Sequence, residues 1–392
     1  MTFSLLVGLK NNLVYTRYFY EQTRLLYPAI EIVFVSYNST DGTHQWLDSL
    51  RDAHVRYHYE NEERTLSDTY NTCTELATAD YVIFAHNDMV LAPGFIEHLA
   101  ECQSENRVVS YTTVEPPVFA DDERPGKLVR DFGADTDTFQ RDVFFEFSRG
   151  EQQRNQAEHK QLAAGNWVTF FLCVARKVLL EVGGLDALFD PMFCEDDDLI
   201  LRLKLKGLEM AVSVNALCYH FVSKTSRFSD EYRQRTTQIE ARSVRNFVRK
   251  WGFRIQSPVR KKYDIGLVLT NGNLALLEEL EPWSSAIYTD IDVAPYVQQE
   301  QAFTVFDLSK RVKSLTGPQP NGVLVSVDGK KMNAEKLAKI AAIHEVIHDR
   351  IHTPERWWNR LLGRPVISFT WHGYRIRVRD RTSYEHQLIH KV

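Results

Sequence analysis

The sequence predicts an α/β fold with two domains: a mostly parallel sheet covered by helices on both faces, then a smaller α/β domain. The first observation is that apolar, strand-like runs alternate with helix-patterned segments from the start of the chain. The second is that a new series of such runs begins after Ser257-Pro258. A length of 392 residues suits two domains, which we place at residues 1–255 and 256–392.

Apolar runs bounded by turn residues predict the strands of the first domain, at residues 4–8, 31–35, 55–59, 81–85 and 210–219. Helical patterning predicts the helices, at residues 11–26, 46–50, 66–77, 177–182, 195–206 and 228–251. We expect the last of these helices to pack across the first domain. Residues 112–160 break the alternation because they are polar and contain Pro116-Pro117. We interpret them as an insertion that lines the functional site.

The second domain is predicted from the same patterns. Its strands are expected at residues 264–269, 286–289, 304–308 and 323–327, with a closing strand or hairpin over 367–378. A helix is expected at residues 334–348. A domain of about 130 residues is of ordinary size.

Composition places the chain among soluble globular proteins, since 44% of its residues are hydrophobic and 25% are charged. No apolar run approaches the roughly 20 residues of a membrane span. The first residues lack the basic flank of a signal peptide, so we expect a cytoplasmic protein. The five cysteines are odd in number and lack zinc-finger spacing, which fits reduced, mostly buried thiols.

The net charge of −5 excludes a basic field over the whole molecule. Two segments are nevertheless basic: residues 224–262, and residues 375–381, where arginines alternate with other residues. Such segments fit either solvated surfaces or a patch for a phosphate-bearing partner.

Carboxylates and a histidine fall at positions where a sheet of this kind places its ligands. Asp88 follows the strand over 81–85, four acids from Glu195 to Asp198 begin a helix, and His220 ends a later strand. Ligands of such sheets lie outside the carboxyl ends of the strands. The pattern therefore predicts a site that combines a divalent metal with a general base.

The chain resembles family 2 glycosyltransferases with the GT-A fold over about residues 3–226. Five segments carry the resemblance, in the family's order: Asn38 to Thr43, Ala79 to Phe84, Val182 to Asp186, Glu195 to Leu199 with Arg202, and His220 with Ser226. The fold implied is a nucleotide-sugar-binding, Rossmann-like α/β domain. The resemblance also implies a nucleotide-sugar donor, a divalent cation and inversion of the anomeric centre.

The resemblance assigns roles to individual residues. Asp88 and His220 match the protein ligands of the metal, which we expect to be Mn²⁺ (or Mg²⁺) because one ligand is an imidazole. Asp196, with Glu195 beside it, matches the region of the catalytic base. The expected contacts to the nucleotide-sugar are Tyr37, Asn38, Asp68, Asn71, His86, Asn87 and Arg227, and those to the acceptor are Trp167 and Asp197. His86 stands where the family has an aspartate, and residues 35–37 lack an acid for the nucleobase, so the nucleotide stays open.

The acceptor is open as well: a polysaccharide, a lipid-linked glycan, or a hydroxylated base in DNA held through basic side chains. The second domain is expected to recognise the acceptor or mediate assembly. The oligomeric state is not predicted.

Two alternatives belong to other classes of protein. The histidine at position 86 permits a catalytically inactive GT-A module that serves as a binding or scaffold protein. His344-Glu345-Val346-Ile347-His348 satisfies the H-E-x-x-H pattern of zinc hydrolases, in which two histidines on one helix face bind zinc and the glutamate activates water.

Overall fold

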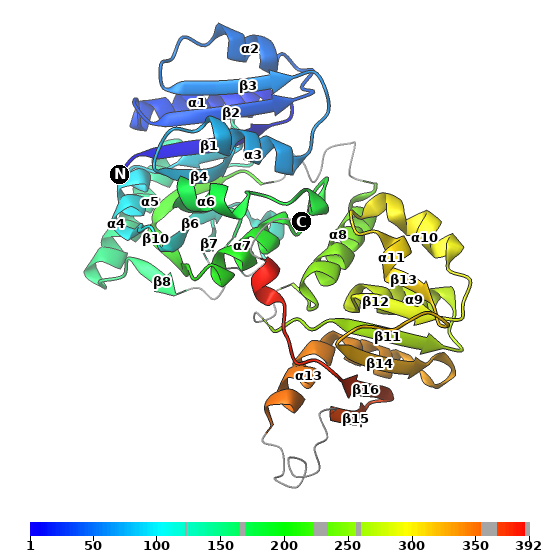
Figure 1. Cartoon of the computed structure of the whole chain (residues 1–392). Helices are drawn as coiled ribbons and strands as arrows, with labels where there is room; N and C mark the ends of the chain where they lie inside the picture. Colours follow the sequence, from blue (N-terminus) through cyan, green and yellow to red (C-terminus); the bar gives the residue numbers. More distant parts are fainter. Residues whose placement is uncertain are drawn as a thin grey trace. The chain divides into compact units, whose positions relative to one another are not determined.

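The computed structural model describes residues 1–121, 124, 126–164, 169–222, 234–255, 260–353 and 367–388. The chain divides into two compact units, Met1–Ile239 and Glu240–Leu388 (Figure 1). This division lies before the predicted boundary at 255/256. The reason is α8 (Thr236–Trp251), whose Val248 packs in the apolar core of the second unit. Residues 240–251 of this helix thus belong to the second unit, whereas the sequence placed the whole helix with the first domain.

The sheet of the first unit has the strand order β3-β2-β1-β4-β9-β6-β10-β5, with β7 beside β6 and β8 beside β10. The strands are β1 (Phe3–Leu9), β2 (Glu31–Tyr37), β3 (Val55–Glu60), β4 (Tyr81–His86), β5 (Met89–Leu91), β6 (Arg107–Glu115), β7 (Lys127–Val129), β8 (Leu162–Ala164), β9 (Leu172–Ala175) and β10 (Glu209–His220). Strands β3, β2, β1 and β4 run parallel to one another, and β6 runs parallel to β10. The β9 strand runs antiparallel to β4 and β6, so the sheet is mixed in its second half.

Helices cover both faces of this sheet because its central strands are apolar on both sides. The helices are α1 (Leu13–Leu26), α2 (Thr43–Ser49), α3 (Leu66–Leu76), α4 (Phe95–Cys102), α5 (Arg141–Ala157), α6 (Arg176–Val182) and α7 (Glu195–Leu205). Leu5 and Val7 of β1 belong to the core that includes side chains of α1, α2 and α4. Leu6 belongs to the core with α3, α6 and α7. The alternation of side chains along β1 thus supplies both cores.

Residues 112–160 are more regular than the sequence predicted. The β6 strand extends through Glu115 inside the sheet, β7 pairs with it in parallel, and α5 is a helix of 17 residues. Phe144 of α5 packs with Tyr219 and Phe221. The strand residues of this segment therefore belong to the sheet, and a few buried contacts stabilise a helix whose sequence is mostly polar.

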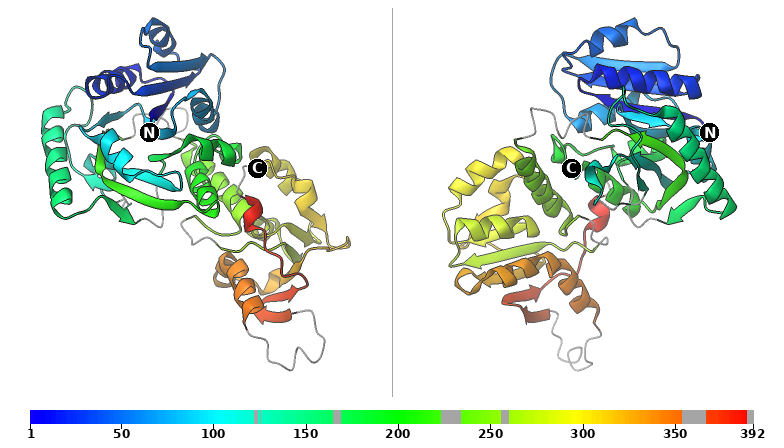
Figure 2. Two further views of the ribbon diagram at one scale, coloured as in Figure 1. Left: turned by 60° about the vertical axis from the view of Figure 1, so that its left-hand side comes forward. Right: turned by 180° about the vertical axis from the view of Figure 1, so that it is seen from behind.

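The second unit contains a six-stranded sheet with the order β13-β12-β11-β14-β16-β15 (Figure 2). Its strands are β11 (Ile265–Thr270), β12 (Ala286–Thr289), β13 (Val312–Ser314), β14 (Val323–Asp328), β15 (Ile367–Trp371) and β16 (Tyr374–Val378), and its other helices are α9 (Leu274–Leu280), α10 (Ala294–Glu300), α11 (Leu308–Arg311), α12 (Ala334–Ala338) and α13 (Ile343–His352). Strands β13, β12, β11 and β14 are parallel, and β15 and β16 form an antiparallel hairpin.

Two predictions for the second unit were wrong in detail. Residues 304–307 form no strand, and α11 begins at Leu308. The helix expected over 334–348 is interrupted by a 3-10 turn at Lys339–Ala342 that separates α12 from α13.

All five cysteines are free and buried, as predicted. Within the described residues, none of the helices has both the length and the apolar character needed to span a bilayer.

Candidate active site

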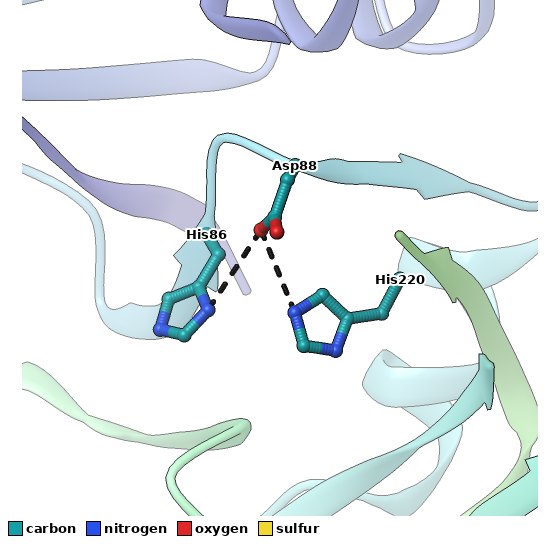
Figure 3. A group of neighbouring side chains, drawn as sticks. All are labelled: His86, Asp88 and His220. Atoms are coloured by element: carbon teal, nitrogen blue, oxygen red, sulfur yellow. Dashed lines mark ion pairs between the residues drawn. The ribbon is translucent and has the colours of Figure 1, made fainter. Parts of the chain in front are cut away.

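Two strand ends bring together His86, Asp88 and His220 (Figure 3). The β4 strand ends at His86, and a two-residue turn leads to β5, which begins at Met89. In the antiparallel pairing of β5 with β10, Met89 lies opposite His220. The Phe221 N–H donates to the carbonyl oxygen of Asp88 at 3.0 Å. Because this pairing fixes the register, Asp88 must lie beside the His220 ring.

The donor atoms of these three side chains have the spacing of a metal centre. Asp88 Oδ1 lies 3.5 Å from His220 Nε2 and 3.9 Å from His86 Nδ1, and one donor atom from each residue lies within 4.8 Å of the others. Ligands about 2.1 Å from a shared cation lie about 3–4 Å apart. His86 Nδ1 is buried and has no hydrogen-bond partner among the residues that the structure describes. One carboxylate and two imidazoles therefore fit a divalent transition-metal ion.

Glu115, at the end of β6, supports His220 from the side opposite Asp88. Its Oε1 lies 3.1 Å from His220 Nδ1, and it also accepts from the Thr113 hydroxyl and pairs with Arg124. Sequence reasoning missed this residue. Its position before Pro116, at a strand end, could have indicated it.

The surroundings push the pKa values of the two imidazoles in opposite directions. Burial lowers the pKa of His86 to about 4, so this ring is neutral at pH 7. Burial alone would lower the pKa of His220 as well, but Asp88 and Glu115 outweigh it and raise that pKa to about 9. Neutral His86 has a lone pair available for a cation.

A pocket of about 280 Å³ adjoins the metal group, since His86 is one of the residues that line it. The other lining residues are Gly8, Leu9, Lys10, Tyr37, Glu63, Arg64, Thr65, Leu66, Thr69, Tyr70, Pro191 and Met192. They come from the carboxyl ends of β1, β2 and β4, from the start of α3, and from the turn before α7. Ligands bind at such strand ends in open α/β sheets.

Among the described residues, the predicted nucleotide contacts Asn38, Asp68, Asn71 and Asn87 lie outside the lining of this pocket. Asp68 closes a capping box with Thr65 at the start of α3. Asn71 accepts from the Leu185 N–H at 2.8 Å and donates to its carbonyl oxygen at 2.9 Å. These hydrogen bonds give both side chains a structural role.

Asn87 and Asn38 occupy the two strand ends beside the pocket. The Asn87 amide is buried and donates to the Thr16 hydroxyl at 2.9 Å, whereas its Oδ1 has no hydrogen-bond partner in the described part of the chain. Asn38 adopts a left-handed backbone with φ 51°, and its N–H donates to the carbonyl oxygen of Glu60. Asn38 therefore shapes the turn after β2.

The four acids at the start of α7 separate into different environments. Asp198 is fully buried and pairs with Arg202 at 2.7 Å, and Arg202 also donates to the carbonyl oxygens of Val182 and Gly184. Burial raises the pKa of Glu195 well above its ordinary value and also raises that of Asp196. Glu195 and Asp196 are thus the acids whose environment favours proton uptake.

One of the three other predicted site residues, Asp197, lies at the start of α7. Asp197 is partly exposed in the first turn of α7, and its N–H donates to Asp196 Oδ1 at 2.9 Å. Trp167 and Arg227 lie outside the described residues.

The H-E-x-x-H residues take part in the packing of the second unit. His344 Nδ1 accepts from the Tyr263 N–H, His348 Nδ1 lies 2.8 Å from the Tyr263 hydroxyl, and Glu345 pairs with Arg260 at 2.6 Å. Within the described residues, the group with metal-ligand geometry is His86, Asp88 and His220. These contacts account for the pattern without zinc.

Known proteins were compared with the chain in three ways. A search of curated proteins gave no match. Among solved structures, TarS of S. aureus is similar at 14% identity, with 56% of this chain and 60% of TarS covered and a TM-score of 0.40. The mannosyltransferase PcManGT of Pyrobaculum calidifontis, in complex with GDP-Man and Mn²⁺, is similar at 18% identity, with 57% and 58% covered and a TM-score of 0.39. The chain covers less than two thirds of either protein.

Comparison with family models matches a defined part of the chain. The family model described as Glycosyl transferase family 2 matches residues 7–174, which include β1 to β4, His86 and Asp88. This match covers the strand-helix alternation from which the α/β fold was predicted. The predicted α/β fold is confirmed by the sheets and their covering helices, and residues 7–174 match the model of family 2 glycosyltransferases.

Proposed function

We propose that this protein is a metal-dependent, inverting glycosyltransferase that transfers a sugar from a nucleotide-sugar to a hydroxyl group. The observation that carries the proposal is that His86 belongs both to the metal-binding group and to the lining of the pocket. A nucleotide diphosphate in that pocket would have its phosphates next to the cation.

His86, Asp88 and His220 would hold the cation, which we expect to be Mn²⁺ because two of the ligands are imidazoles. When bound, it supplies positive charge for the diphosphate leaving group. Tyr37 offers an aromatic wall to the pocket, and its hydroxyl lies 2.9 Å from the Thr72 hydroxyl, which holds the ring in place.

Asp196 or Glu195 would act as the general base. The acceptor oxygen attacks the anomeric carbon from the face opposite the diphosphate, the bond from that carbon to the phosphate oxygen breaks, and the acceptor proton passes to the carboxylate. Burial raises the pKa of both carboxylates, and a carboxylate whose pKa lies closer to the working pH is a better proton acceptor. Single displacement of this kind inverts the anomeric centre.

A thermal-shift screen of nucleotide-sugars, with and without Mn²⁺, tests donor and metal together. A true donor should raise the melting temperature only when the metal is present, because ligands that bind only the folded state stabilise it. Asp88→Asn should abolish the part of the melting-temperature rise that depends on Mn²⁺. Glu209→Gln, a change at an exposed carboxylate that pairs with Arg107, serves as the control and should leave the shift intact.

Transfer is tested separately with the donor so identified. Asp196→Asn should lower turnover by about 100-fold or more while retaining the thermal shift, since general-base groups contribute about 10²–10⁴-fold. NMR of the product should show the opposite anomer from the donor. Absence of any metal-dependent shift across the common nucleotide-sugars would contradict the proposal and favour a scaffold protein.

A further inference from the structure

One face of the sheet in the second unit lies away from the helices. Ile265, Leu267 and Leu269 of β11 belong to the apolar core that includes side chains of α8, α9, α10, α11 and α13. Val268, between them, points to the other side and packs with Ala286, Tyr288 and Leu315. In the described part of this unit, the second cluster contains no helical residue.

The strand register places one row of side chains across all six strands on this second face. The row consists of Lys313, Tyr288, Val268, Ser326, Arg375 and Thr370, each residue paired with the next. A neighbouring row contains Leu324, Arg377 and Ser368. Arg379 continues the alternation, and its Nη1 donates to the carbonyl oxygen of Gln319. We call Lys313, Ser326, Ser368, Thr370, Arg375, Arg377 and Arg379 the arginine face.

Arg375 and Arg377 are exposed, and neither has an ion pair with any residue that the structure describes. Two carboxylates at the ends of the central strands, Asp264 just before β11 and Asp328 at the end of β14, already have partners. Asp264 accepts from Asn321 and from the Gly322 N–H. Asp328 accepts from the Asn271 amide and lies 3.5 Å from Lys331 Nζ. The two guanidinium groups are therefore available to an anion from outside the unit.

Charge is distributed unequally between the units. Residues 240–388 hold 23 lysines and arginines against 16 aspartates and glutamates, a formal charge of +7. The rest of the chain holds 24 against 36, a formal charge of −12. An asymmetry of this kind is typical of chains in which one domain binds a polyanion.

We infer that the arginine face binds a nucleic acid through its phosphodiester backbone. Arginines on alternate strand residues are about 7 Å apart and so present positive charges at a regular interval. This spacing suits a chain of regularly repeated phosphates better than a single anion. Guanidinium groups bind phosphate in a bidentate manner, and serine and threonine hydroxyls donate to phosphate oxygens. Tyr288 is fully buried and offers no ring for base stacking, so binding should be independent of sequence.

Fluorescence anisotropy with a labelled single-stranded DNA of about 20 nucleotides tests this inference on the full chain. The wild type should bind, and its affinity should fall as salt rises. In the Arg375→Ala/Arg377→Ala variant the affinity should fall at least about tenfold. The slope of log K against log salt should shrink by about 1.4, since each phosphate contact contributes about 0.7 with single strands. A DNA of scrambled sequence should bind equally well.

A matched control separates this face from general charge. Lys339→Ala/Arg350→Ala removes two exposed cations from the helical side of the same unit and should leave affinity and slope unchanged. Arg375→Lys/Arg377→Lys keeps both positive charges and should therefore retain the slope. The inference would be overturned if both alanine variants lost DNA affinity equally, or if the salt slope of Arg375→Ala/Arg377→Ala were unchanged. Tighter binding to vesicles of phosphatidylglycerol than to DNA would also overturn it. The assay needs no sugar donor, so its result is independent of the proposed transfer activity.

Discussion

Replacement of Glu115 by glutamine tests whether the carboxylate behind His220 sets the metal affinity of the site. Glu115 is 2% exposed, with Oε1 3.1 Å from His220 Nδ1 and Oε2 3.8 Å from Lys127 Nζ. It keeps the Nδ1 proton on the far side of the ring and leaves Nε2 facing Asp88. It also neutralises Arg124 and Lys127, which would otherwise repel a cation.

The size of the effect follows from these contacts. Carboxylates that orient a ligating histidine contribute about 10- to 100-fold in metal affinity, or about 1.4–2.7 kcal/mol. Two cations lose their counter-charge in the glutamine variant, so we expect the upper end, about 100-fold weaker binding of Mn²⁺.

Isothermal titration with Mn²⁺, without nucleotide, measures this affinity directly. Glu209→Gln removes a carboxylate at the surface and should bind like the wild type. Melting temperatures recorded for both variants separate loss of the site from loss of the fold. If Glu115→Gln bound Mn²⁺ as tightly as the wild type, the assigned role of Glu115 would be refuted.

Three further predictions concern stability and metal choice. Arg202→Leu should destabilise the first unit by about 3–5 kcal/mol in urea unfolding, because it leaves Asp198 buried without its guanidinium; Asp198→Leu/Arg202→Leu should lose less than the sum of the single changes. His86→Asp should shift preference from Mn²⁺ towards Mg²⁺ in competition titrations, since oxygen ligands favour Mg²⁺. Burial raises the pKa of Asp190 from 3.8 to about 6, so the folded state favours the protonated carboxyl group. The stability that this protonated group contributes is full below pH 4 and is lost as the pH rises through 6. Asp190→Asn should therefore gain stability over the wild type at pH 7.5 but not at pH 4, by at most about 3 kcal/mol before solvent screening.

The parallel half of the first sheet could be predicted from the sequence because its signals are local. The β1, β2 and β4 strands are continuous apolar runs, and the turn residues after each of them are visible in the chain. The α3 helix carries its own start signal in the capping box of Thr65 and Asp68. Elements of this kind depend little on distant partners.

The elements between residues 89 and 157 depend on partners far away in sequence. The β5 strand has only three residues and exists because it pairs with β10. The α5 helix buries Phe144, Ser148 and Asn155 on one side, too few apolar residues for a periodic signal. Glu115 becomes part of the site because β10 lies parallel to β6 and brings His220 beside it. No local pattern contains that information.

The acid cluster shows how one sequence signal can conceal several roles. Helical geometry puts Asp198 one turn before Arg202, so the two form an ion pair within α7. Arg202 in turn donates to the carbonyl oxygens of Val182 and Gly184, which joins α7 to that turn. That ion pair occupies Asp198, so it is unsuited to take a proton from an acceptor. Glu195 and Asp196 lie at the helix start, where burial raises their pKa values, and no described residue forms a hydrogen bond with Glu195 Oε2. The last acid of the run therefore anchors the helix, and the first two are the acids that we propose for proton transfer.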